Sequence, residues 1–380
     1  PADEAAYIAD RLADDPMMQA LNEVELALDA LESPDAVRFQ VEPPEAHAAR
    51  IQLRALQMAR PLAARDRAVA LDSILQRFKR AVARGLAKLW SRFDKAMAWW
   101  DTIEDYLTFV SRLLMAEREI FNALREAYKS VDDVTLVHLM MDMQYAYDPP
   151  DPPRYPFDEQ VRRMRRLAED SGGVLLGFTA FHPRRCKSSF KLPDGFYGVK
   201  FYPAMGYRPA ENDDPEIEES VNQFFRVCRT NDTPVFAHCT PRGFEARRGW
   251  GLNAHPKYWA VALKKHPDLR LCLGHAGGGA MENSGLKSAG WYARDDAEWN
   301  DPGNFAAGVV DLCRRYEHVY CEFGHLDALI HGDGQIREAF EANFVREWKR
   351  DEQSSDKPYL FAKKSMFGTD HHMAKMINHV

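Results

Sequence analysis

The feature that most constrains the fold of this chain is a series of short apolar runs that each finish on a titratable residue. The four clearest runs, at 234–240, 269–275, 319–323 and 365–371, carry His238, His275, Glu322 and Asp370. A segment with helical periodicity separates each run from the next. Short buried strands that alternate with helices indicate parallel β/α units. Polar residues at the carboxyl ends of such strands are where a (β/α)8 barrel builds its active site.

The same alternation extends upstream of these four runs. Strands are predicted at 134–141, 173–181 and 197–202, and helices at 157–170, 216–231, 256–266, 305–316 and 334–350. The pattern therefore predicts seven strands in residues 134–380, one fewer than a closed barrel contains. The connection from 181 to 197 shows no helical pattern.

The first third of the chain has a different pattern. Residues 1–130 are helical in periodicity and show no strand, and the composition changes at 131–133. We expect a helical accessory or cap region at 1–131 and a barrel at 132–380. The predicted fold class is therefore α/β, a distorted (β/α)8 TIM-type barrel with a large helical N-terminal region. Since residue 1 is Pro and no signal-peptide pattern follows, we expect native residues to be missing at one or both chain ends.

The charge balance and the cysteines limit the class of partner. Lys and Arg number 50 against 57 Asp and Glu, a formal net charge of −7, which argues against nucleic acid or an anionic membrane. No apolar run reaches the length of a membrane span. The six cysteines show no CxxC spacing, so free thiols in a cytoplasmic protein are expected. The predicted partner is a small-molecule substrate, and association into a homo-oligomer stays open.

The strand-end residues suggest metal chemistry. His238 and Asp370 form the strongest pair, because zinc-type metals bind imidazole nitrogen and carboxylate oxygen and lower the pKa of a bound water. Asp370 could also accept a proton from that water, and His275 is placed to be a second ligand or a general acid/base. The competing interpretation is that each is a hydrogen-bonded structural residue at a barrel rim. The predicted cofactor is a divalent metal, with zinc favoured.

A second group of residues suggests an anionic substrate. Lys200 lies inside a predicted strand, where it could pair with a carboxylate, be carbamylated to bridge two metals, or form a buried ion pair. Tyr202, Arg208 and Arg242 lie in loops expected at the barrel mouth, and Arg suits bidentate carboxylate binding. The glycines at 277–279 allow a close backbone approach to a ligand.

Five segments carry a resemblance to a known family. FAHCT, LGHAGGG, VYCEFG and FGTDHH, preceded by GVKFYPAMGYRP, resemble the metal-dependent amidohydrolase superfamily. More narrowly they resemble the amidohydrolase-2 group, which includes aminocarboxymuconate semialdehyde decarboxylase, over about residues 132–380. The resemblance implies that His238 is the strand-five metal ligand and His275 the strand-six ligand or acid/base. It also implies that Asp370 is the strand-eight metal-binding aspartate and Lys200 the strand-four lysine.

One departure from that family pattern leaves two explanations open. The family's first strand ends in a His-x-His pair of metal ligands, and no His-x-His occurs in this sequence. In one explanation the strand at 134–141 is strand one and its ligands are replaced. In the other it is strand two, a His-x-His strand lies upstream of Pro1, and residues 1–130 are an insertion between strands one and two. The seven-strand count favours the second.

The activity expected from these patterns is metal-assisted hydrolysis of a C–N or C–O bond. Metal-activated water would attack a small anionic substrate, with Asp370 taking the proton and His275 assisting. Two alternatives stay open. One is non-oxidative decarboxylation on the same barrel, and the other is a catalytically silent barrel that acts as an interaction module.

Overall fold

The computed structural model describes residues 117–146, 155–187, 189–241, 245–247, 249–278, 288–324, 334–353 and 359–368. The chain divides into two units, 1–120 and 121–380, and the second unit is described here by itself. Arg242, Asp370 and residues 1–116 of the predicted accessory region lie outside the described residues. The roles and boundaries expected of them therefore stay predictions.

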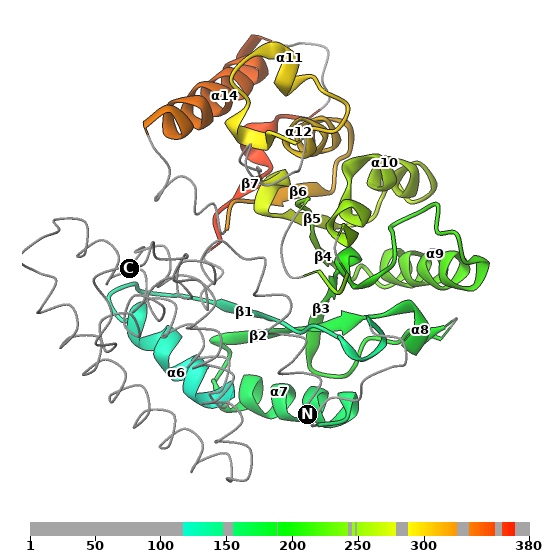
Figure 1. Ribbon diagram of the computed structural model, residues 1–380. Helices are drawn as coiled ribbons and strands as arrows, with labels where there is room; N and C mark the ends of the chain where they lie inside the picture. The colour runs from blue at the N-terminus through cyan, green and yellow to red at the C-terminus, as the bar shows by residue number, and fades with distance from the viewer. Residues whose placement is uncertain are drawn as a thin grey trace, which may run out of the picture. The chain divides into compact units, whose positions relative to one another are not determined.

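Seven strands of the described residues form one parallel sheet in chain order. They are β1 (Leu136–Leu139), β2 (Leu175–Phe181), β3 (Phe196–Phe201), β4 (Val235–His238), β5 (Leu271–Gly274), β6 (Val319–Glu322) and β7 (Ser365–Met366). The seven predicted strands and the α/β fold class are thus confirmed. The sheet curls as the wall of a TIM-type barrel does (Figure 1), and within the described residues β1 and β7 each pair with one neighbour only.

Helices connect the strands much as the periodicity predicts. The longer ones are α6 (Glu117–Ala127), α7 (Phe157–Asp170), α9 (Pro215–Thr230), α10 (Pro256–Lys265), α12 (Phe305–Arg315) and α14 (Gly334–Gln353). Short elements are α8 (Pro183–Cys186), α11 (Asp296–Trp299) and the 3-10 turns η1 (Gln144–Ala146), η2 (Pro203–Met205), η3 (Trp250–Ala254), η4 (His275–Gly277), η6 (Gly290–Tyr292) and η7 (Phe361–Lys363).

Helix α8 corrects the expectation that the connection after β2 lacks a helix. It is a single turn in which Pro183 occupies the first helical position and His182 accepts a hydrogen bond from the Arg184 backbone N–H. A turn of four residues is too short to produce an apolar periodicity, so the sequence pattern gave no sign of it.

Helices α9 and α12 begin where a side chain accepts hydrogen bonds from their free backbone N–H groups. Asp214 accepts from the backbone N–H groups of Glu216 and Ile217 at 2.9 and 3.5 Å, and Pro215 follows it. Asn304 accepts from Ala307 N at 3.2 Å at the start of α12. A polar N-cap with Pro at the first helical position is a strong start signal.

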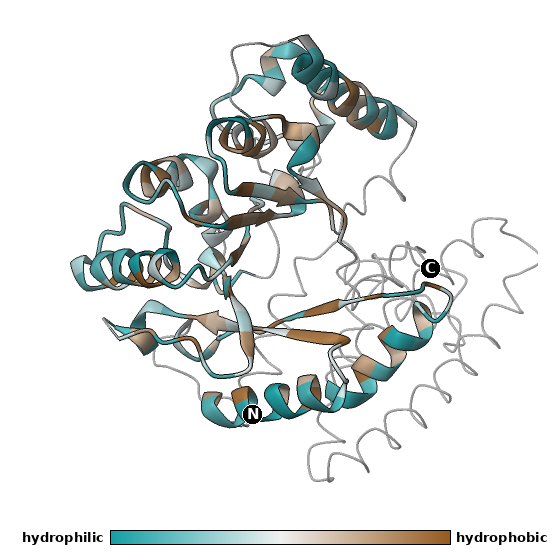
Figure 2. Cartoon of the chain, turned by 180° about the vertical axis from the view of Figure 1, so that it is seen from behind, coloured by the Kyte–Doolittle hydropathy of each residue, from teal (hydrophilic) through white to brown (hydrophobic). Residues whose placement is uncertain are grey.

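The two faces of the sheet are different. Val199, Val235, Leu271 and Val319 are at most 2% exposed and lie in one apolar cluster with residues of α9, α10 and α12. Because side chains alternate along a strand, the neighbouring positions point to the other face: Lys200, Phe236, Cys272 and Tyr320, which register aligns across β3 to β6. Figure 2 shows the apolar colour concentrated on the strands and on parts of the helices. The helices therefore cover one face, and the other face leads to the strand-end residues.

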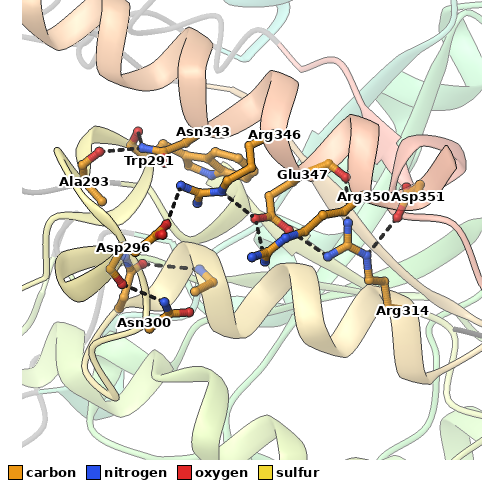
Figure 3. A network of polar contacts seen from close by, with 12 residues as sticks. Trp291, Ala293, Asp296, Asn300, Arg314, Asn343, Arg346, Glu347, Arg350 and Asp351 are labelled. Carbon is orange, nitrogen blue, oxygen red and sulfur yellow. Dashed lines mark hydrogen bonds and ion pairs between the residues drawn. The ribbon is translucent and has the colours of Figure 1, made fainter. Parts of the chain in front are cut away.

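A buried ionic network ties α14 to α12 (Figure 3). The Arg314 guanidinium binds Glu347 at 2.7 Å and Asp351 at 2.8 Å, and Glu347 also pairs with Arg346 and Arg350 at 3.1 Å. The Asp351 carboxylate accepts a further bond of 2.8 Å from the backbone N–H of Ala362. Since Ala362 lies in η7, directly before β7, the network also anchors the segment that leads into the last strand.

Two further observations concern the chain as a whole. None of the helices among the described residues combines the length and apolar character that crossing a bilayer requires. All six cysteines are free thiols.

Candidate active site

Strand register places two of the strand-end residues, His238 and Glu322, at one level of the sheet. His238 of β4 aligns with Gly274 of β5, which aligns with Glu322 of β6, which aligns with Met366 of β7. All these strands are parallel, so this level is their shared carboxyl end. Residues at one level share a face, and the side chains of His238 and Glu322 therefore flank the bare backbone of Gly274.

The structure brings His238 and His275 together. Their ring centroids are 5.0 Å apart with an interplanar angle of 71°. The His238 ring is also stacked on the ring of Tyr202, at 4.5 Å and 15°, and His238 is 2% exposed. A Cβ at Gly274 would lie 2.7 Å from the Phe236 ring, so glycine leaves space between the strand ends. The two imidazoles, one buried and one partly buried, therefore lie side by side at the predicted position.

The end of β6 orients His275. Its Nδ1 lies 2.9 Å from the carbonyl oxygen of Gly324, an acceptor, so Nδ1 carries the hydrogen and donates it. Its backbone N–H donates to Glu322 at 3.2 Å. In the neutral ring this leaves the lone pair on Nε2, the arrangement that a metal-ligating or proton-accepting histidine needs.

The turn that carries His275 is strained. His275 and Ala276 have φ of 62° and 46°, and Gly277 and Gly278 follow at 83° and 57°. Two successive non-glycine residues at positive φ are rare, and such strain persists only where surrounding contacts determine it. Strained backbone is concentrated at functional sites, which agrees with a functional role for this turn.

Glu322 is a site residue to which the sequence analysis gave no role, although it was one of the four strand-end residues. Its side chain is buried, and a Cβ at Gly324 or at Gly368 would clash with its carboxylate. The carboxylate is therefore held between the backbones that follow β6 and β7. The signal that pointed to it was the apolar run VYCEF, and its contact with the His275 backbone was not visible there.

Lys200 lies on the same face as His238, two residues earlier in register. It pairs with Phe236 across β3 and β4, and its ammonium is 4.5 Å from the Phe236 ring centroid and 5.4 Å from that of Tyr202. Lys200 is 5% exposed and Tyr202 8%. An ammonium over two aromatic rings is a cation–π arrangement. The structure thus brings Lys200, Tyr202 and the two histidines together.

The hydrogen bonds and the ion pair of the Arg208 guanidinium are made to neighbouring loop residues. Its guanidinium donates to Asn253 at 3.2 Å and to the Glu211 carbonyl at 2.9 Å, and it pairs with Asp213 at 3.5 Å. These contacts tie the 208–213 loop to η3. Binding of substrate by Arg208 stays a prediction.

A second polar cluster lies after β1 and β2, and its side chains bond to one another and to the loops. Asp142 is buried and ion-paired with Arg185, which also donates to Gln144 at 2.8 Å. His182 lies beside it, 5.2 Å from the ring of Tyr207, and burial lowers its pKa to about 4. The sequence analysis assigned no role to His182, although an apolar run ends directly before it. A neutral, capping histidine and a paired carboxylate support the loops around the site.

The comparisons with known proteins agree with this geometry. Residues 193–373 match the family model described as amidohydrolase. In this segment the chain is similar to the amidohydrolase family. The matched segment includes β3 to β7 and the residues His238, His275 and Glu322. The predicted resemblance to the amidohydrolase-2 group is confirmed. No curated protein matches the chain.

Several solved structures resemble the fold of the chain. An uncharacterised TIM-barrel protein from Bordetella bronchiseptica is 12% identical, with 71% of this chain and 74% of that chain covered and a TM-score of 0.41. A 2,6-dihydroxybenzoate decarboxylase from Rhizobium is 16% identical, with 72% and 85% covered and a TM-score of 0.38. A 5-carboxyvanillate decarboxylase from Novosphingobium aromaticivorans, complexed with manganese and 4-hydroxy-3-methoxy-5-nitrobenzoic acid, is 12% identical, with 70% and 76% covered and a TM-score of 0.39.

The pair of His238 and His275 fits a divalent metal. With metal–nitrogen bonds of about 2.0–2.1 Å, two imidazoles whose centroids are 5.0 Å apart are close enough to bind one ion. The Gly324 carbonyl supplies the outer hydrogen bond that metal-bound histidines usually make. Among the described residues no set of three His, Cys, Asp or Glu side chains is grouped to hold a metal. Asp370, the third predicted ligand, lies outside them.

Proposed function

We propose that this chain is a metal-dependent enzyme of the amidohydrolase type that hydrolyses a C–N or C–O bond in a small anionic substrate. The observation that carries the proposal is the close pair of His238 and His275 at neighbouring strand ends, with the His275 tautomer set by Gly324. An imidazole that only fills space has no need of a strained turn and a fixed tautomer.

Three residues would bind the metal and move the proton. His238 and His275 would hold a divalent metal, for which we propose zinc, together with Asp370. The metal, when bound, supplies Lewis-acid activation of a water molecule. Asp370 would accept the proton, and His275 would hold or return a proton at Nε2, because Nδ1 is engaged by the Gly324 carbonyl.

The substrate's anionic group would be held by Lys200, whose ammonium is buried against the rings of Phe236 and Tyr202. Tyr202 would cover one side of the bound molecule, and Arg208 and Arg242 are proposed as additional contacts at the mouth. Holding the substrate at several points is what aligns the reacting bond with the activated water.

Non-oxidative decarboxylation is the second candidate. The observation that favours it is the setting of Lys200, since a cation flanked by aromatic rings suits a planar, conjugated carboxylate. The same histidine pair would serve both reactions. The two differ in product, because only decarboxylation releases CO2.

The test is turnover by the purified protein supplied with Zn²⁺, Mn²⁺ or Co²⁺. Lactones, cyclic amides and aromatic carboxylates are offered, and hydrolytic products and CO2 are measured separately. We expect turnover that a chelator abolishes and that His238→Asn lowers by at least a hundredfold. The control is His318→Asn, which changes a histidine directly before β6, at the opposite end of the strands.

The proposal is wrong if His238→Asn turns over substrate as the wild type does. Absence of turnover with every metal would instead favour the catalytically silent barrel. Release of CO2 without a hydrolytic product would assign the second candidate.

A further inference from the structure

The strained turn at His275 is bonded to one distant residue through two of its carbonyls. The indole Nε1–H of Trp291 donates to the Ala276 carbonyl at 2.7 Å. The backbone N–H of Trp291 donates to the Gly278 carbonyl at 3.1 Å. Trp291 lies in η6. Through these two hydrogen bonds it holds Ala276, the residue after His275, and Gly278.

Trp291 is itself immobilised by packing. It is 0% exposed, and its ring contacts a set of aromatic side chains with centroids 5.3–6.1 Å away: Trp299, Phe323, Phe340, Phe344 and Phe361. Such a cluster holds the indole in one rotamer. The direction of its N–H is thus fixed before any ligand arrives.

Helix α14 fixes the backbone of the same residue. The Asn343 side-chain amide donates to the carbonyls of Trp291 at 2.9 Å and of Ala293 at 2.7 Å (Figure 3). Asn343 is 2% exposed, so these bonds are made away from water. A continuous set of contacts runs from α14 through Asn343 and Trp291 to the turn.

The turn needs such a clamp, because its conformation is unfavourable by itself. Ala276 has φ of 46° and is 0% exposed, and its carbonyl would be left unbonded in the interior without the indole N–H. The other side of the turn is closed by α12, since a Cβ at Gly277 would lie 2.6 Å from the backbone of Ala306. The turn is therefore held between Trp291 and the start of α12.

We propose that Trp291 is a positioning residue for His275. By holding the Ala276 and Gly278 carbonyls it stabilises the strained turn, and the turn places the His275 imidazole opposite that of His238. Trp291 touches neither a substrate nor a metal in this account. The inference rests on the proposed function only in so far as His275 acts in the reaction.

The test compares Trp291→Phe with Trp299→Phe. The first change removes the indole N–H that bonds Ala276, and the second alters a neighbouring buried tryptophan of the same aromatic cluster. Two readouts are used. One is the ¹⁵N spectrum of the histidine imidazoles, with the His275 signals assigned from their loss in His275→Asn, and the other is the Kd for Zn²⁺ measured by competition with a chelator.

We expect Trp291→Phe to change the Nδ1–H signal of His275 and to raise the Kd for Zn²⁺ by about ten- to a hundredfold, as loss of a group supporting a metal ligand does. Trp299→Phe should lower the unfolding midpoint yet leave the His275 signal unchanged and the Kd within twofold of wild type. The proposal would be overturned if both variants lowered the unfolding midpoint equally and neither changed the His275 signal or the Kd for Zn²⁺. Packing alone predicts that result.

A second variant covers the case in which Trp291→Phe does not fold. Replacing Trp291 by 3-benzothienylalanine keeps the size of the ring and removes only the N–H. An unchanged His275 signal in that variant would overturn the proposal, and a changed one would support it. If the wild-type protein binds no Zn²⁺, the proposed function fails, whereas the His275 spectrum still decides the role of Trp291.

Discussion

Single residues at the strand ends decide whether the site can form, and the clearest case is a glycine. Gly277 has φ of 83°, and a Cβ there would lie 2.6 Å from Ala306. We expect Gly277→Ala to lower the free energy of unfolding by about 2–4 kcal/mol, through backbone strain and overpacking together. Denaturant unfolding measures this loss.

The control for that change is Gly173→Ala, which has φ of 91° and no atom within 4 Å of the added Cβ. It should lose only the backbone contribution, about 1 kcal/mol. Equal losses in the two variants would show that close packing at Gly277 is unimportant.

Lys200 provides a second prediction at this scale. Lys200→Met removes the cation buried beside Phe236 and keeps much of its volume, so we expect KM for an anionic substrate to rise about tenfold or more, equivalent to about 1.4 kcal/mol of binding. Lys264→Met, on the exposed side of α10, is the control. Steady-state kinetics measures KM for both variants. Equal KM values for Lys200→Met and Lys264→Met would count against the role of Lys200.

The sequence predicted some of these residues and missed others for a physical reason. His238 and His275 were found because an apolar run that ends on a polar residue is a local pattern. Trp291 was missed because it bonds to the backbone carbonyls of Ala276 and Gly278. Every residue has such a carbonyl, so the sequence does not mark these two as acceptors. Arg208 was assigned to the mouth by its place after β3, and its bonds to Asn253 and Glu211 depend on how the loop folds.

At the scale of elements, α14 is joined to the barrel by charge as well as by packing. The side chains of Arg314, Glu347 and Asp351 are 8%, 1% and 4% exposed. Arg314→Met would leave two buried carboxylates without their main partner, and we expect a loss of about 3–5 kcal/mol in the free energy of unfolding.

The comparison for Arg314 is its neighbour Arg315, which pairs with Asp311 on the surface with 42% and 46% exposed side chains. Arg315→Met should cost no more than about 1 kcal/mol. Thermal and urea unfolding of both variants check the difference, and a small, equal effect would mean that the buried network adds nothing to the attachment of α14.

The sequence predicted the bounds of an element well where the element is long enough to repeat its apolar pattern several times. Helices α7, α9, α10 and α12 fall within a residue of the predicted ranges, because three or more turns give a clear apolar repeat. Helix α8 has four residues and was missed, and β7 pairs over two residues although the apolar run around it is longer.

At the scale of the whole molecule, buried histidines make stability depend on pH. Burial lowers the pKa values of His182, His255 and His266 to about 4. Their folded-state pKa values are below the unfolded value of about 6.5, so the folded protein binds fewer protons. The stabilisation is complete above about pH 6.5 and is lost as the pH falls toward 4.

We therefore expect the free energy of unfolding to fall between pH 7 and pH 4.5, with His182 contributing on the order of 3 kcal/mol at most. His182→Asn keeps an N-cap acceptor before α8 and should flatten this dependence. Urea unfolding at several pH values measures it, and identical profiles for the variant and the wild type would exclude His182 as a source.

The count of strands is the other whole-molecule feature that the sequence predicted. It followed from alternation alone, whereas the alignment of His238, Gly274 and Glu322 at one level required the register between strands. Whether a His-x-His strand accompanies these seven stays a prediction.

The central claim is that His238 and His275 together hold a divalent metal. The direct measurement is the Kd for Zn²⁺ of the wild type, His238→Ala, His275→Ala and His318→Ala, with bound metal counted by elemental analysis. The account predicts one strongly bound ion in the wild type and in His318→Ala, and at least a hundredfold weaker binding in each of the other two. Wild-type affinity in His238→Ala and His275→Ala would contradict it.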